Sequence, residues 1–321
     1  MRGQRGTLYE IPLCIALLVV SLAIAVPQPA WPRRIAAFLL IPGCLLLLFL
    51  LVWGVSAAMS ARRMKRLLRG LQSPDPAARR KAAKGLEDLG ADAAGAAPAL
   101  VRTLQDTEEA VRLQAALALA SVKPDEGEAA AELVKALQGP GVKPREKAAE
   151  ALGRMGSAAR GAAQDLARAL LDKSWEGRWQ AASALSFIRP EAAKVLPELL
   201  EALKDPDPLA AEWAARALGR IEPAGRDAVD ALIAAMSESR RGVRGAAMGS
   251  LGDIGPAAAA AVPGLARALK DEDSWIRGVA AASLGEIGPA AREVLPELRG
   301  LAQDPDEWVR GVAAGAVDRL S

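Results

Sequence analysis

The chain lacks histidine altogether and is poor in cysteine and aromatic residues. Its 321 residues include no His, one Tyr, three Phe and two Cys. Both cysteines, Cys14 and Cys44, lie in apolar runs near the N-terminus. The remainder therefore offers neither thiol nor imidazole, which excludes Ser-His-Asp and Cys-His nucleophiles, the usual zinc ligand sets and a disulfide framework. We expect no catalytic residue, no metal and no cofactor.

Two long apolar runs open the chain. Residues 35–59 carry no charge, and 25 residues at about 1.5 Å each form about 37 Å of helix, which is enough to cross a bilayer. We predict a transmembrane helix there. The shorter run at 11–26 is either a second span or a cleaved signal, because Ala23-Ile24-Ala25 resembles a signal-peptidase site. Residues 1–34 are thus assigned to an N-terminal apolar segment and a linker.

A basic cluster without any acid follows the longer run. It comprises Arg62, Arg63, Lys65, Arg66 and Arg69. Because basic flanks stay on the cytoplasmic side, the rest of the chain faces the cytosol whether 11–26 spans or is cleaved. We predict an integral protein of the inner or plasma membrane with a basic juxtamembrane helix at 60–72 and its bulk, 73–321, in the cytoplasm. The stretch from Arg62 to Arg69 is a candidate for contact with anionic lipid.

The bulk of the chain repeats itself every 33 residues. Alanine recurs at positions 82, 115, 148, 181, 214, 247, 280 and 313, each followed four residues on by Leu or, in the last repeat, Val317. A second column, half a repeat away, is leucine throughout, at 67, 100, 133, 166, 199, 232, 265 and 298. A fixed period of this length is typical of a solenoid of stacked helical units.

Each repeat is predicted to form two helices. The first carries small or apolar residues at i, i+4 and i+7, as at Ala115, Leu119 and Val122. It often ends at a glycine suited to a left-handed cap (Gly90, Gly156, Gly255, Gly288), and a proline then opens the second helix (Pro98, Pro197, Pro263, Pro296). Because the two helices of one repeat cannot bury the apolar faces of both helices by themselves, neighbouring repeats must stack. We predict an all-α fold, a right-handed α-solenoid of about eight 33-residue helix pairs.

The first helix carries the pattern D-x(5)-R-x-x-A-A-x-x-L, as from Asp172 to Leu185 and from Asp271 to Leu284. With a proline opening the second helix, this pattern resembles HEAT repeats. More narrowly, it is similar to the short bacterial type grouped with phycobilisome lyase HEAT-like repeats.

The resemblance implies a structural ladder of Asp and Arg along the stack, with a ligand-binding row as the alternative. The expected members are Arg79, Arg112, Arg145, Arg178, Arg244, Arg277, Arg310, Asp106, Asp172, Asp205, Asp271 and Asp304. The columns break at Gly139 and Ala211, where we expect flexing or altered curvature.

Two sets of surface residues are candidates for binding a partner. On the second helix, the position two after the core leucine is expected on the inner face, and its basic members are Arg69, Arg102, Lys135, Arg168 and Arg267. This column is either a basic track for an acidic partner segment or a solvated face partly neutralised by Glu132 and Asp165. Tryptophans near the start of the first helix either pack between repeats or anchor a partner: Trp175, Trp275 and Trp308, with Trp179 and Trp213 nearby.

The charge balance argues against nucleic acid as a partner. Although the whole chain has a net charge of +3, residues 70–321 hold 32 basic and 37 acidic side chains. A surface that binds a duplex needs the opposite excess. We therefore predict a membrane-anchored, non-catalytic scaffold that binds a protein partner. The alternative is a bilin lyase-like or other chromophore- or protein-modifying accessory factor, which only the similarity of the repeat type suggests.

Overall fold

The computed structural model describes residues 62–125, 127–221 and 224–321. These divide into two compact units, the first ending at Arg69 and the second running from Gly70 to Ser321. Residues 62–69 are helical and belong to the first unit. The predicted apolar segments at 11–26 and 35–59 lie outside the described residues.

The second unit is all-α, and the described part of it contains no β-strand. Its α-helices are α3 (Pro76–Leu89), α4 (Ala97–Thr103), α5 (Glu109–Val122), α6 (Glu128–Gln138), α7 (Val142–Met155), α8 (Ala163–Leu170), α9 (Arg178–Ile188), α10 (Ala192–Ala202), α11 (Pro208–Leu218), α12 (Arg226–Ala235), α13 (Arg241–Ile254), α14 (Val262–Ala268), α15 (Ser274–Ile287), α16 (Leu295–Gly300) and α17 (Glu307–Leu320). Short 3₁₀ helices are η1 (Gly90–Ala96), η2 (Gly156–Ala162), η3 (Gly255–Ala261), η4 (Gly288–Val294) and η5 (Leu301–Gln303).

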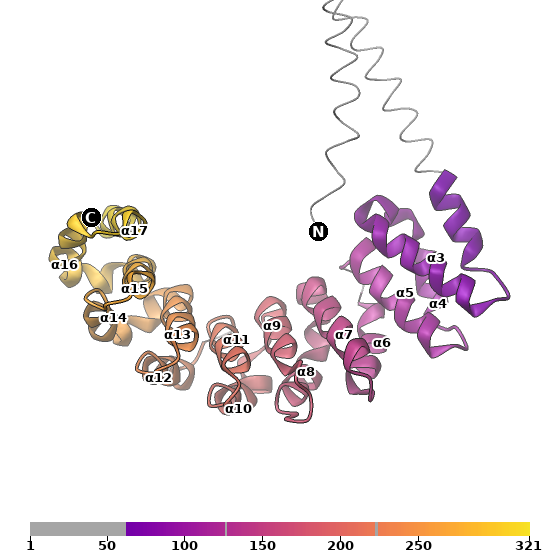
Figure 1. Ribbon diagram of the computed structural model, residues 1–321, viewed down its shortest axis with the longest axis horizontal. Helices are drawn as coiled ribbons and strands as arrows, with labels where there is room; N and C mark the ends of the chain where they lie inside the picture. Colours follow the sequence, from indigo (N-terminus) through magenta and orange to yellow (C-terminus); the bar gives the residue numbers. More distant parts are fainter. Residues whose placement is uncertain (1–61, 126, 222–223) are drawn as a thin grey trace, which may run out of the picture. The chain divides into compact units, whose positions relative to one another are not determined.

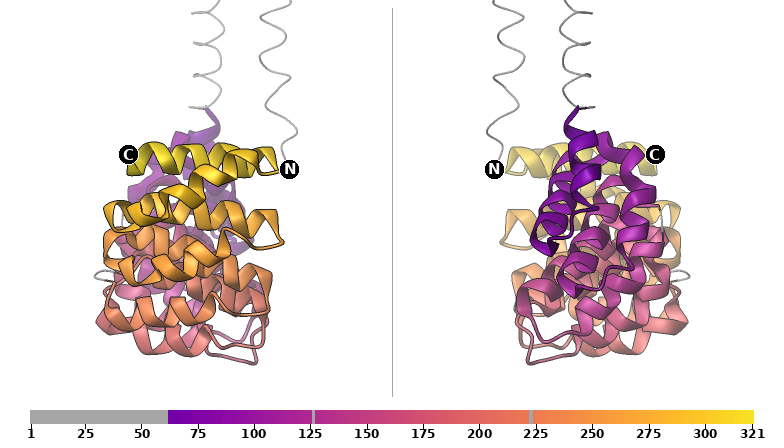
Figure 2. Two further views of the ribbon diagram at one scale, coloured as in Figure 1. Left: turned by 90° about the vertical axis from the view of Figure 1, so that its left-hand side faces the viewer. Right: turned by 90° about the vertical axis from the view of Figure 1, so that its right-hand side faces the viewer.

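Within this unit, helix pairs stand side by side in chain order along a curved row (Figure 1 and Figure 2). The odd-numbered helices carry the Arg and Ala-Ala motif, and from α7 onward they follow the concave side of the row, with the even-numbered helices on the convex side (Figure 1). Successive odd-numbered helices accordingly contact each other far more than successive even-numbered ones. The unit is thus an α-solenoid, as predicted, while its handedness stays a prediction.

Alanine and leucine build the core. Ala115 and Leu119 of α5 are fully buried, as are Leu133 of α6 and Leu166 of α8 in the second column. Alanine leaves room for close approach of neighbouring helices, and leucine fills the space between the two layers. A chain poor in aromatic residues therefore still forms a continuous core.

Glycine ends four of the odd-numbered helices as the sequence predicts. Gly90, Gly156, Gly255 and Gly288 have φ of 57°, 54°, 70° and 78°, a region that residues with a Cβ rarely adopt. Their ψ values, −136°, −129°, −137° and −141°, lie outside the left-handed helical region, so the predicted left-handed cap is wrong in this respect. A 3₁₀ helix follows each of these glycines before the next α-helix begins. Proline takes the second position of α4, α14 and α16. The prediction for Pro197 is wrong, because α10 begins at Ala192 and contains Pro197 in its interior.

The membrane localisation requires correction. None of the helices described at 62–125, 127–221 and 224–321 is both long enough and apolar enough to cross a bilayer. On this finding we withdraw the assignment to the inner or plasma membrane with a cytoplasmic repeat domain.

Candidate functional site

Arginines on the odd-numbered helices join each repeat to the next. Arg277 Nε and Nη2 donate to the carboxylate of Asp304 at 2.7 and 2.9 Å, while Nη1 donates to the backbone oxygen of Asp271 at 2.9 Å. The carboxylate lies 27 residues later in the chain and the carbonyl six residues earlier, so one guanidinium links two repeats. The shortest N–O distances in five such pairs, Arg79–Asp106, Arg145–Asp172, Arg178–Asp205, Arg244–Asp271 and Arg277–Asp304, are 2.6, 2.7, 2.9, 3.2 and 2.7 Å.

These bonds lower the pKa of the ladder carboxylates. The hydrogen bond from Arg79 holds the pKa of Asp106 below its usual value, and that from Arg277 does the same for Asp304. At Asp205, burial acts to raise the pKa, but the hydrogen bonds from Arg178 and from the backbone of Asp207 outweigh it. The carboxylates are therefore held ionised by groups of the chain itself.

Both predicted breaks in the ladder are bridged. Gly139 occupies the position at which the ladder would place a carboxylate for Arg112. Arg112 Nε donates instead to Glu132 Oε1 on α6 at 2.9 Å. The second break is at Ala211, which stands where the ladder would place an arginine. Arg240 supplies the guanidinium there. Its Nη1 donates to the backbone oxygen of Asp205 at 2.7 Å, and its Nη2 lies 3.4 Å from Glu238 Oε2. Other residues thus bridge both positions, while the expectation of flexing or altered curvature there stays a prediction.

Two members of the basic column lie on the opposite face from the one predicted. Arg102, Lys135, Arg168 and Arg267 are exposed on α4, α6, α8 and α14, and from α7 onward Figure 1 shows the even-numbered helices, which here carry Arg168 and Arg267, along the convex side. The inner-face assignment is wrong because it took the helix opened by proline to face inward. Lys135 lies 3.0 Å from Glu132 and Arg168 3.1 Å from Asp165.

The remaining basic candidate, Arg69, is exposed on the helix of the first unit, where its Nε donates to Lys65 O at 3.5 Å. A role in partner binding for the column, and anionic lipid contact at Arg62 to Arg69, stay predictions.

Three predicted tryptophans pack within the solenoid. Trp175 is 1% exposed, with the Arg145 guanidinium 4.4 Å above its ring. Trp275 and Trp308 lie against glycines of the preceding repeat, since a Cβ at Gly245 would fall 2.1 Å from the Trp275 ring and one at Gly278 2.0 Å from Trp308. Trp308 still exposes 46% of its surface.

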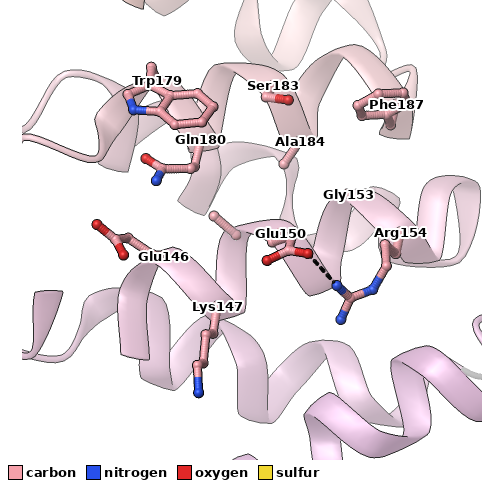
Figure 3. A pocket seen from close by; sticks show the side chains of 11 residues that line it. Glu146, Lys147, Glu150, Gly153, Arg154, Trp179, Gln180, Ser183, Ala184 and Phe187 are labelled. Carbon is pink, nitrogen blue, oxygen red and sulfur yellow. Dashed lines mark hydrogen bonds and ion pairs between the residues drawn. The ribbon is translucent and has the colours of Figure 1, made fainter. Parts of the chain in front are cut away.

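The concave side holds two clefts that meet at Phe187. The first, about 500 Å³, lies between α7 and α9, and its aromatic wall is Trp179 and Phe187 (Figure 3). The second, about 340 Å³, extends over α9, α11, α13 and α15, with Phe187, Trp213 and Trp275 in its lining. Phe187 is 53% exposed. Leaving a phenylalanine side chain in water is unfavourable, because burial of its apolar surface would stabilise the fold. We call these two clefts together the concave groove.

Small residues bring the groove helices together. At Gly153 a Cβ would lie 3.2 Å from the Ala184 backbone, and at Gly219 and Gly252 it would lie 2.9 Å from the backbones of Ser250 and Ser283. The aromatic side chains therefore stand above a floor of closely packed helices. Sequence analysis placed Trp179 and Trp213 near the predicted patch and missed Phe187, because it assigned the inner face to the other helix. The available signal was an aromatic residue at a position that is polar in neighbouring repeats.

Three ion pairs lie in the groove. Arg154 Nη1 lies 2.6 Å from Glu150, and Arg216 Nη2 lies 2.6 Å from Glu212 while its guanidinium covers Trp213 at 4.8 Å. Arg220 lies 3.6 Å from Asp253. No group of His, Cys, Asp and Glu suited to hold a metal occurs among the described residues. The arrangement offers apolar area with a polar rim, which is the anatomy of a surface that binds protein.

Comparison with known proteins identifies the family of the chain. The family model for HEAT repeats matches residues 64–142, 196–284 and 243–318, whereas no curated protein matches the sequence. An X-ray structure of YibA from Escherichia coli is 20% identical, with a TM-score of 0.50, over 82% of this chain and 95% of its own. The crystal structure of an engineered protein is 21% identical, with a TM-score of 0.39, over 80% of this chain and 88% of its own. Identity this low shows the fold alone. The narrower resemblance to phycobilisome lyase repeats stays a prediction, but more than half of the chain is matched, and it belongs to the HEAT-repeat family.

Proposed function

We propose that this protein is a non-catalytic scaffold that binds a segment of a partner protein in the concave groove. The observation that carries the proposal is the exposed Phe187 at the meeting point of two clefts, with Trp179, Trp213 and Trp275 around it. Aromatic residues grouped in a concave, rimmed surface are the usual anchors of protein interfaces.

The groove fits a segment better than a compact domain. It runs across successive odd-numbered helices from α7 to α15, so a partner chain lying along the row meets each cleft in turn. Repeat proteins offer such extended concave surfaces because a small rotation between successive repeats curves the row.

Affinity capture with matched variants of the full chain tests the proposal. The concave variant carries Phe187→Ser and Trp213→Gln, and the convex variant reverses Arg102, Lys135 and Arg168 to Glu. We expect a partner to be retained by the wild type and the convex variant and lost by the concave variant. Loss from the convex variant alone would instead place the binding surface on the basic column. Thermal unfolding of each variant shows whether the fold is kept.

A further inference from the structure

We propose that the cleft between α7 and α9 receives an arginine or lysine side chain of the partner segment. The proposal rests on the proposed function and names the chemistry of that partner. It starts from Trp179 and Glu146, which line the same cleft (Figure 3).

Trp179 differs from the other tryptophans that line the groove or the core beneath it. Arg145 covers Trp175 at 4.4 Å, Arg216 covers Trp213 at 4.8 Å and Arg241 covers Trp275 at 4.7 Å. Among the described residues, none places a cation over Trp179, although its ring borders the cleft and is partly exposed. An indole face attracts a guanidinium or an ammonium through its quadrupole, so the position is open for a cation from outside.

The charges around the cleft favour the same occupant. Four charged residues line it: Glu146, Lys147, Glu150 and Arg154. Glu150 and Arg154 neutralise each other at 2.6 Å. In Figure 3 the Lys147 side chain points away from the two aromatic residues, whereas the Glu146 carboxylate lies on the side of Trp179 and Gln180. Glu146 is half-buried, and no partner for it occurs within the described part of the chain. A carboxylate in this position attracts a cation to the indole.

The other end of the cleft carries Phe187, on the same side as Arg154 and its partner Glu150 (Figure 3). Phe187 follows Trp179 by eight residues on the same helix, which places the two about 12 Å apart. Between them, Gly153 and Ala184 form a floor where a Cβ would lie 3.2 Å from backbone. An extended segment spans about 12 Å in three to four residues. The occupant therefore carries a basic side chain three or four positions from a large apolar one.

Selection from a random peptide library against the full chain tests this inference. We expect the enriched peptides to share an Arg or Lys three or four positions from a large aliphatic or aromatic residue. Glu146→Gln should weaken their binding about fivefold and Trp179→Leu about tenfold. The control Glu201→Gln, which removes an exposed carboxylate on α10 outside the cleft, should change it by less than about twofold. Thermal unfolding of each variant confirms that the fold is intact.

Two outcomes separate this inference from the proposed function. Peptides that need Phe187, as judged by Phe187→Ala, but that carry no basic residue or bind Glu146→Gln as tightly as the wild type would overturn the cation site and leave the groove in place. If no peptide binds, or if binding ignores Phe187→Ala, Trp179→Leu and Glu146→Gln alike, both the cation site and the groove fail.

Discussion

The indole of Trp275 lies on Gly245 of the preceding repeat so closely that a Cβ at Gly245 would fall 2.1 Å from Trp275 Cη2. The next repeat shows the same relationship between Trp308 and Gly278. The glycine and the tryptophan thus form a matched pair, one residue in each of two neighbouring repeats. Gly278 and Trp308 of the second pair lie in the near-identical stretches beginning at Asp271 and Asp304.

Gly245→Ala should destabilise the solenoid by about 1–3 kcal/mol, because the new methyl must displace an indole held between two helices. Gly311→Ala is the control at the same repeat position, since nothing lies within 4 Å of a Cβ there. It should leave stability unchanged or raise it by up to about 1 kcal/mol, as alanine favours a helix. Denaturant unfolding measures both. Equal effects of the two substitutions would contradict the packing argument.

Arg240→Ala should lower the free energy of unfolding by about 1–3 kcal/mol, because the backbone oxygen of Asp205 and the carboxylate of Glu238 both lose a charged donor. Ala211→Arg in the same chain should restore most of the loss by supplying a guanidinium from the usual position. Arg226→Ala, which removes an exposed side chain, should stay within about 0.5 kcal/mol. If the double variant Arg240→Ala, Ala211→Arg is no more stable than Arg240→Ala alone, Arg240 does not replace the arginine that the ladder lacks at position 211.

Acid should weaken the ladder. The pKa values of Asp106, Asp205 and Asp304 are lower in the folded chain than the unfolded value of about 3.9, so the unfolded state takes up protons first. The stability these residues contribute is present above about pH 5 and is lost as the pH falls through 4 toward the folded values. Thermal unfolding from pH 7 to pH 2.5 should show this decline. Asp106→Asn with Asp304→Asn should be less stable at neutral pH and show a shallower decline; an unchanged slope would contradict the assignment.

Gly255→Ala should destabilise by about 1–2 kcal/mol because φ is 70° at this residue and a Cβ clashes with the backbone in that region. Gly161→Ala in η2 is the matched control, since a Cβ there meets nothing within 4 Å and its φ is not positive. Differential scanning calorimetry of the two variants compares them directly. A larger effect at Gly161 would be inconsistent with a strained cap at Gly255.

Most of the repeat architecture could be predicted from the sequence because it depends on local, periodic features. Ala115 and Leu119 lie in the core, and Gly255 has the positive φ expected of its position. Pro197 was misplaced because a single residue type does not fix where a helix starts. The role of Arg240 could not be predicted, because Arg240 lies outside the arginine column and reaches Asp205 and Glu238 only in the folded chain.

The concave groove was harder to predict. Periodicity shows which residues of a helix pair are buried, but both helices of a pair have an exposed side, and the curvature of the row decides which one faces inward. The basic column at Arg168 and Arg267 was therefore assigned to the wrong face. Phe187 stands in a repeat column that is polar in its neighbours, Arg154 and Arg220, and its significance appears only once this column is known to face the concave side.

The substitution of Arg240 for a guanidinium at position 211 limits which segments of the chain can be exchanged as modules. Excising the repeat that contains Arg244 and Arg240 would bring Ala211 opposite Asp271, and that carboxylate would have no guanidinium to meet. Excising the following repeat would instead bring Arg244 opposite Asp304, a pairing of the usual kind. Thus removing one 33-residue unit should be tolerated when it is the repeat of Arg277, whereas removing the repeat of Arg244 leaves the Asp271 carboxylate without a guanidinium, although the two repeats share the same sequence pattern.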